Sequence, residues 1–163
     1  MDAIKLLEAQ HHEVEDLFEK AEKARGPARR MALFLKIADA LAIHTAIEEK
    51  IFYPAAMSKR TEDELLESVE EHLAAKRIIA DMLELDAKDR TFEAKLSVLK
   101  EEVLHHVEEE RAELFPQVKK EMSRDALDAL GDEMAELAES LEDEAPRSEV
   151  PHQIREAAAL PPA

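Results

Sequence analysis

The sequence predicts an all-α protein, an up-down-up-down four-helix bundle with an additional C-terminal helix. Glycine is rare, at 2 of 163 residues, whereas alanine, leucine, glutamate and lysine, which are strong helix formers, dominate. Apolar residues recur at steps of three and four along four segments, which is typical of helices that bury one face. The connections between these segments are short, so consecutive helices should be antiparallel neighbours.

Residue types at the helix ends delimit the first two helices. Asp2 is suited to cap the first helix, which should end near residues 25–27, where Gly26 provides a stop and Pro27 a start. The second helix should run from about residue 28 to residue 57. Pro54 should disturb its last turns, because proline lacks a backbone N–H.

Similar residues delimit the other helices. Thr61 and Glu64 have the spacing of a capping box, which should open a third helix that fades near residues 86–90. Thr91 is suited to cap a fourth helix that reaches Pro116. We therefore expect a bundle over residues 1–120 and an additional amphipathic helix within residues 121–143. The acidic, proline-punctuated residues 144–163 should be disordered.

Composition excludes several classes of function. With a formal net charge of −17, the chain lacks the basic surface that nucleic acids or anionic lipids would require. It has no cysteine, so thiolate zinc sites and iron–sulfur clusters are excluded. No signal peptide and no apolar run of membrane-spanning length is recognisable, so we expect a cytoplasmic protein.

Histidine interrupts the apolar stripe of each bundle helix, and two stripes also carry a glutamate one turn later. If loop centres lie near residues 26.5, 59.5 and 89.5, the histidines of successive helices mismatch in height by two, three and one residues. At about 1.5 Å per residue these offsets are a few ångströms, so all four should meet in one layer. The six residues are His11, His44, Glu48, His72, His106 and Glu110.

An internal repeat supports this layer. His44 and Glu48 are followed by Pro54 with the same spacing that separates His106 and Glu110 from Pro116. Histidine and glutamate four residues apart share one helix face, so each pair can serve one metal site.

A metal centre explains why so polar a layer is tolerated inside a bundle. Burying an ionised carboxylate without a partner costs several kcal/mol, and two glutamates with four histidines in one dry layer would exceed the roughly 5–15 kcal/mol stability of a domain. Rotating the helices would move these groups into water, but would expose the neighbouring apolar residues. Imidazole and carboxylate suit iron, manganese or zinc, and six ligands suit two ions. We favour two iron ions, with manganese or zinc as substitutes.

A resemblance to the hemerythrin-like, HHE cation-binding family is carried by the segments LLEAQHHEVEDLF, IHTAIEEKIFYP, EEHLAAKRII and LHHVEEERAELFP. It covers roughly residues 3–120 and implies an oxo- or hydroxo-bridged di-iron centre that meets oxygen, peroxide or nitric oxide. It matches all six residues of the layer to the family's ligands, and makes Glu48 and Glu110 the bridging carboxylates.

Two positions depart from the oxygen-carrying members. Lys76 stands where a fifth histidine is expected, and either extends to solvent or leaves an open coordination site with a cation beside it. Glu110 follows His106 by four residues rather than five, as in four-histidine, two-glutamate members. His105 has the five-residue spacing and could replace His106, although helix register favours His106. The flanking His12 should be a surface or supporting residue, and His152 lies in the predicted tail.

The functional hypothesis is a di-iron protein that binds, senses or reduces a small diatomic or peroxide ligand, with enzymatic turnover left open. The alternative is an iron-sensing or partner-binding module without turnover, whose C-terminal helix would contact a protein partner. A ferritin-like site is a third reading, because Glu8/His11 and Glu102/His105 have Glu-x-x-His spacing. That reading needs a long crossover, which the short second connection does not provide.

Overall fold

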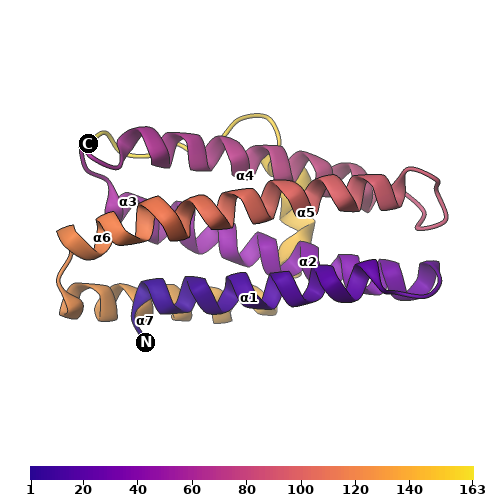
Figure 1. Cartoon of the computed structure of the whole chain (residues 1–163), viewed down its shortest axis with the longest axis horizontal. Coiled ribbons are helices and arrows are strands. Elements are labelled where there is room, and N and C mark those ends of the chain that lie inside the picture. The colour runs from indigo at the N-terminus through magenta and orange to yellow at the C-terminus, as the bar shows by residue number, and fades with distance from the viewer.

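Four long helices lie side by side and alternate in direction in the computed structural model, which describes residues 1–163 (Figure 1). They are α1 (Ala3–Glu22), α2 (Pro27–Ile47), α4 (Glu62–Leu83) and α5 (Phe92–Glu109). Helix α2 is prolonged by η1 (Glu48–Phe52) and α3 (Tyr53–Ala56), and α5 by η2 (Glu110–Leu114) and α6 (Phe115–Glu121). The chain ends with α7 (Arg124–Glu142) and η3 (Pro146–Gln153). This architecture confirms the predicted bundle with its additional C-terminal helix.

The helix caps agree with the sequence at one end and differ at two others. The carboxylate of Asp2 accepts a hydrogen bond from the backbone N–H of Lys5 at 3.0 Å, as predicted. The prediction of a capping box at Thr61 is wrong. The Thr61 hydroxyl instead donates a hydrogen bond to the carbonyl oxygen of Ala56 at 2.7 Å, which stabilises the turn between α3 and α4. Thr91 makes no side-chain cap either, since its hydroxyl donates to Asp89 at 2.6 Å.

Two π-helical turns interrupt the repeated segments, one beginning at Glu48 and the other at Glu110. In each turn, the N–H of the fifth following residue donates to the glutamate carbonyl. Pro54 and Pro116 lie two residues after the ends of these turns and explain them, because a proline removes one α-helical hydrogen bond and crowds the carbonyl four residues earlier. The wider turn lets each helix continue past its proline. Such turns are frequent at functional sites.

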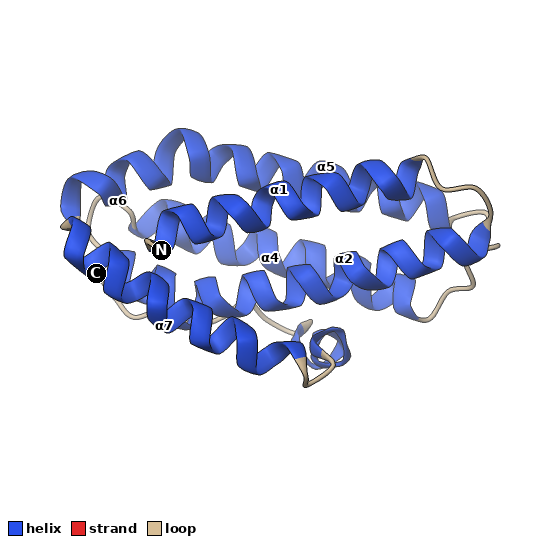
Figure 2. Ribbon diagram, turned by 90° about the horizontal axis from the view of Figure 1, so that it is seen from below, coloured by secondary structure: helices blue, strands red, loops and turns tan.

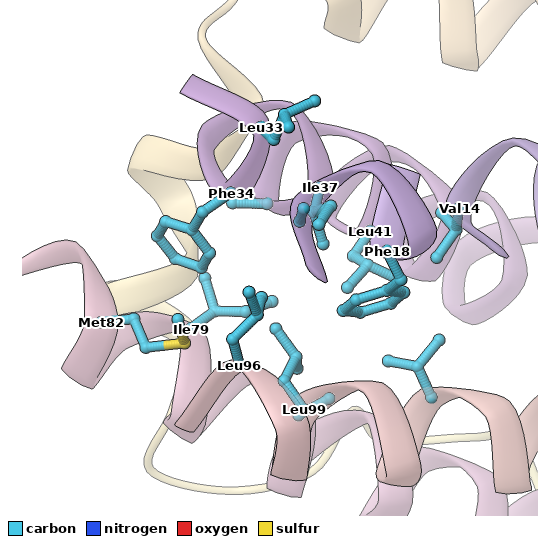
Figure 3. Close-up of a cluster of buried hydrophobic side chains, with 14 of the residues drawn as sticks. Val14, Phe18, Leu33, Phe34, Ile37, Leu41, Ile79, Met82, Leu96 and Leu99 are labelled. Carbon is cyan, nitrogen blue, oxygen red and sulfur yellow. The ribbon is translucent and has the colours of Figure 1, made fainter. Parts of the chain in front are cut away.

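Two apolar clusters fill the interior at opposite ends of the bundle. Figure 3 shows part of one cluster, with Phe18, Phe34 and Leu99. This cluster also includes Phe92 and lies toward the α1–α2 and α4–α5 loops. The other lies toward α3, α6 and α7 and includes Phe52. On α1, for example, the residues before His11 belong to the second cluster and those after it to the first. The polar layer therefore lies between two dry regions.

Helix α7 lies outside the bundle alongside α1 and α2 (Figure 2). Its side chains Leu127 and Met134 are buried in the second apolar cluster. The approach to α1 depends on Gly131, since a Cβ atom there would overlap the carbonyl oxygen of Met1 and lie 2.8 Å from the backbone N of Ala3. The predicted fifth helix thus covers one end of the bundle.

The C-terminal tail differs from the disorder that its composition suggests. Residues 146–153 form a 3-10 helix that packs against α2 and α4, and Val150 is 1% exposed within the first apolar cluster. Three apolar residues farther along, Ala157, Ala158 and Leu160, pack against the second cluster. A few apolar side chains therefore order this acidic segment on the bundle. No helix of the chain has the length and apolar character needed to cross a bilayer.

Candidate metal centre

The structure brings all six predicted site residues together in one buried layer. Each side chain belongs to a residue no more than 6% exposed, and both glutamates are fully buried. Helix α1 contributes one histidine, α4 another, and the α2–η1 and α5–η2 segments each contribute a histidine and a glutamate. The four histidines therefore lie at one height in the bundle, as their distances from the loop centres predicted, although those distances differ by up to three residues.

The donor atoms divide into two groups that share Glu48. The first group consists of His11, His44, Glu48 and Glu110, and the second of Glu48, His72 and His106, with the donor atoms of each group within 4.8 Å of one another. One oxygen of Glu48 lies 3.0 Å from Nε2 of His44, and its other oxygen lies 2.9 Å from Nε2 of His72. A carboxylate that faces two sets of imidazoles in this way has the arrangement of a bridge between two ions.

The carboxylate of Glu110 also faces both groups. Its Oε1 lies 3.1 Å from Nε2 of His11 and 3.3 Å from Nε2 of His106. Its Oε2 lies 2.9 Å from the hydroxyl oxygen of Tyr53, which lies at the same distance from Oε2 of Glu48, so the two carboxylates share the one hydrogen that this hydroxyl donates. Glu48 and Glu110 thus hold equivalent positions, as their repeat in the sequence suggests.

Tyr53 is the site residue that the sequence analysis missed. Its hydroxyl oxygen lies 3.2 Å from Nε2 of both His72 and His106, so it is a further oxygen donor for the second group. In a regular α-helix, five residues turn through about 500°, which would leave Tyr53 roughly 140° around the axis from Glu48. The π turn brings it back over Glu48. The signal in the sequence was the proline directly after it.

The first donor group has a phenyl ring at the equivalent position. Phe115 follows Glu110 by five residues, as Tyr53 follows Glu48, and stacks on His11 at 5.8 Å between ring centroids. It offers no donor atom. The two halves of the repeat are therefore chemically unequal, with a phenol beside the second group and an apolar ring beside the first.

Polar residues on neighbouring helices orient three of the four imidazoles. Nδ1 of His44 lies 2.7 Å from the amide oxygen of Gln10, and Nδ1 of His106 lies 2.9 Å from Glu71. Nδ1 of His72 lies 2.9 Å from Glu49. An N–H at each Nδ1 leaves the lone pair of Nε2 facing the layer, which is the arrangement of metal-binding histidines. These orienting residues adjoin proposed ligands in sequence but serve a histidine on another helix.

Lys76 does not extend to solvent. It is 6% exposed, and its Nζ donates to both oxygens of Glu49 at 2.9 and 3.1 Å. Burial would raise the pKa of Glu49, but hydrogen bonding and charge from His72 and Lys76 hold the pKa below its usual 4.5. His72 and, to a smaller extent, Lys76 therefore keep this carboxylate ionised.

The pKa values of the layer show the electrostatic cost of its burial. Burial lowers the pKa of His11 to about 4. Burial, and then the neighbouring charge of Glu48, raises the pKa of Glu110 to about 8. The pKa of Glu48 is well below 4.5 although burial opposes this, because His44 and other imidazoles favour its charged form. The pair of carboxylates thus prefers one proton unless additional positive charge is present.

The other histidines lie outside the layer. His105 is exposed and lies 2.9 Å from Glu109, so it does not replace His106. His12 and His152 are exposed as well. The ferritin-like alternative fails because its second histidine would be His105 and because residues 57–61 form only a short connection.

The donor set fits metal ions. Five buried atoms of the layer residues have no hydrogen-bond partner, although some lie near one another without the alignment of a hydrogen bond. Such atoms are costly to bury in a native protein unless a ligand satisfies them. A metal would use their lone pairs, and the nitrogen and oxygen donors suit first-row transition metals. The five atoms are Nδ1 and Nε2 of His11, Nε2 of His44, Oε1 of Glu48 and Oε1 of Glu110; of these, His11 Nδ1 is the one that an Nε2-bound ion would leave unpaired.

Comparison with known proteins places the chain by fold and by family. A crystal structure of a hemerythrin HHE cation-binding domain-containing protein from Mycobacterium kansasii superimposes with a TM-score of 0.79 at 23% identity, covering 95% of both chains, which shows a shared fold. A curated protein from Nostoc sp. named DNA nickase is 25% identical over 113 residues, or 69% of this chain. The alignment spans 32% of the nickase. The family described as hemerythrin HHE cation binding domain matches residues 2–118, and the chain therefore belongs to this family.

Proposed function

We propose that the layer holds two iron ions and that this centre binds or reduces a small oxidant, such as oxygen, nitric oxide or peroxide. The observation that supports the proposal is the sharing of Glu48 between two groups of histidines. In this arrangement, His11 and His44 would hold one ion, and His72 and His106 would hold the other. Glu48 and Glu110, which face both groups, would each contribute to both ions, and the Tyr53 oxygen would add a donor on the second side.

The charges of the two buried carboxylates favour the binding of two divalent or trivalent metal ions in the layer. Without a bound metal, Glu110 keeps its proton up to about pH 8, whereas bound cations would favour the ionised form of both carboxylates. A pair of iron ions, when bound, supplies electrons and open coordination positions for a small ligand. Manganese and zinc accept the same donors, so we propose iron as the native metal and these as substitutes.

The chain's own residues prepare the site for this role. Gln10, Glu49 and Glu71 fix three imidazoles with Nε2 inward, which lowers the entropy lost on binding metal. Lys76 helps to hold Glu49 in its charged form. The apolar clusters on both sides exclude bulk water from the layer. The ring of Phe115 leaves the first group with fewer donors than the second, so we place the ligand-binding position there.

The test is metal quantification in protein purified from iron-supplied cells, for the wild type and three variants. Wild type should carry about two irons per chain, and Glu48→Ala and His106→Ala should lose most of this metal and melt at lower temperature. His105→Ala is the matched control, because it removes the adjacent, exposed histidine of the same helix. Full occupancy in both site variants would overturn the ligand assignment.

Spectra of the iron-loaded protein then separate binding from turnover. Mixing with nitric oxide or peroxide should change the optical spectrum of wild type but not of Glu48→Ala. Consumption of many equivalents of peroxide would identify an enzyme, whereas one stoichiometric change would identify a sensor or binding module. A DNA-directed role is not proposed, because the relative named as a nickase is matched over a third of its length and this chain has a net charge of −17.

A further inference from the structure

A segment outside the region matched to the family crosses the side of the bundle next to the metal centre. This strap, residues 146–154, follows α7 and lies across α2 and α4 (Figures 1 and 2). Arg147 anchors one end on α2, where its backbone N–H and guanidinium both bond the carboxylate of Asp39, at 3.1 and 2.6 Å. The guanidinium of Arg77 on α4 holds the other end, donating to the carbonyl oxygen of Ile154 at 3.1 Å.

Between these anchors, Val150 points into a cavity that reaches the proposed ligands. The cavity has a volume of about 30 Å³, and all four histidines of the layer line it. Val150 is 1% exposed and lines the same cavity, together with apolar residues of α1, α2, α4 and α5. The wall residues are Val14, Leu41, Ala42, Ala75, Ile79, Val103 and Val107.

The size and lining of the cavity restrict what it can hold. About 10–15 Å³ of such space accommodates one water, so this cavity has room for about two water-sized molecules or one diatomic. Most of the surface that its walls present is apolar, although Gln10, Thr45 and Glu102 also line it. An apolar surface disfavours an ion, since a buried charge needs a partner. Lys76 lines the cavity but already pairs with Glu49, so its charge is not available to an entering anion.

We propose that the strap is a size and charge filter for the metal centre, and that Val150 is its specificity-determining residue. With the strap in place, a neutral diatomic molecule of the oxygen or nitric oxide class reaches the histidines through small fluctuations of the apolar walls. A charged or larger molecule enters only when the Arg147–Asp39 contact opens and Val150 leaves. The ligand class rests on the proposed function, whereas the closure of the cavity by the strap does not.

The first test uses xenon, a neutral apolar atom that is wider than oxygen or nitric oxide, so the closed strap should obstruct it, and its binding does not depend on the metal. Xenon NMR of the full chain should detect binding in the cavity and measure exchange with bulk solution. Val150→Ala and Asp39→Ala should each speed exchange about tenfold, because a strap that has lost its side chain or its anchor opens more often. Val98→Ala is the matched control, since it makes the same substitution at a 48% exposed residue of α5.

The second test compares a charged with a neutral ligand in the iron-loaded protein. Association of azide should accelerate about tenfold in Val150→Ala and Asp39→Ala, and association of nitric oxide less than about twofold, because the closed strap mainly obstructs the anion. Equal xenon exchange in all four proteins, or an unchanged ratio of azide to nitric oxide rates, would overturn the filter even with the di-iron centre established. Faster xenon exchange in a chain that takes up no iron would support the filter and refute the proposed function.

Discussion

The buried ion pair between Lys76 and Glu49 allows a quantitative test of how the layer is supported. The lysine and glutamate side chains are 8% and 12% exposed, and Nζ lies 2.9 Å from the nearer oxygen. Lys76→Met keeps most of the length of the side chain and removes its charge. The carboxylate of Glu49 would then keep only the imidazole of His72 as a partner.

The expected loss follows from the burial of the pair. Removing one partner of a buried ion pair costs about 3–5 kcal/mol, and the remaining contact with His72 places Lys76→Met near about 3 kcal/mol. In a protein of this size, 1 kcal/mol corresponds to about 2–4 °C, so the melting temperature should fall by about 6–12 °C. Glu49→Gln leaves the lysine unpaired and should cost a similar amount. The double variant should lose about 2 kcal/mol less than the sum of the two.

Differential scanning calorimetry, with all variants in the same metal state, measures these differences. Lys100→Met is the control, because Lys100 also lies 2.9 Å from a carboxylate, that of Glu22, but the pair is 25% and 47% exposed. Its loss should stay below about 1 kcal/mol. The reasoning is refuted if Lys76→Met matches wild type within about 0.5 kcal/mol, or if the double variant is additive.

Three further predictions concern single residues. Tyr53→Phe removes the hydroxyl that contacts two buried carboxylates. In urea titrations of chelator-treated protein, this substitution should lower the free energy of unfolding by about 2–4 kcal/mol. In the iron-loaded protein, it should abolish any phenolate-to-iron absorption. Burial, and then the charge of Glu113, raise the pKa of Glu64 from 4.5 to about 7. The protonated form of Glu64 therefore stabilises the fold below pH 4.5, and this contribution to stability is lost as the pH rises through 7. Glu64→Gln should therefore match wild type at pH 4 and be more stable at pH 8, by about 1 kcal/mol once its partial exposure is discounted; equal stability at pH 8 would contradict this pKa. Gly131→Ala should lower the melting temperature by an amount equivalent to about 1–3 kcal/mol, because the added Cβ atom would force α7 away from Met1. An unchanged melting temperature would show that α7 can shift away from Met1 at little cost in stability.

Much of the fold and the six-residue layer could be predicted from the sequence, because they depend on order along the chain. The three-and-four spacing of apolar residues fixes which face of each helix is buried. His44 and Glu48 share that face whatever surrounds them, and short loops fix the antiparallel order that brings four histidines to one height. The repeat of histidine, glutamate and proline added a second, independent indication.

Other features were decided by tertiary structure. The position of Tyr53 depends on a π turn, which changes the angle between residues that a regular helix would keep apart. Lys76 is buried because it pairs with the oppositely charged Glu49, which lies 27 residues earlier on a different helix. The acidic tail orders because Val150 finds an apolar site between helices that are distant from it in sequence. Local periodicity depends only on neighbours along the chain. The rotation of helices, the pairing of ions and the docking of the tail instead depend on contacts between residues that are distant in sequence, and only the folded molecule brings those residues together.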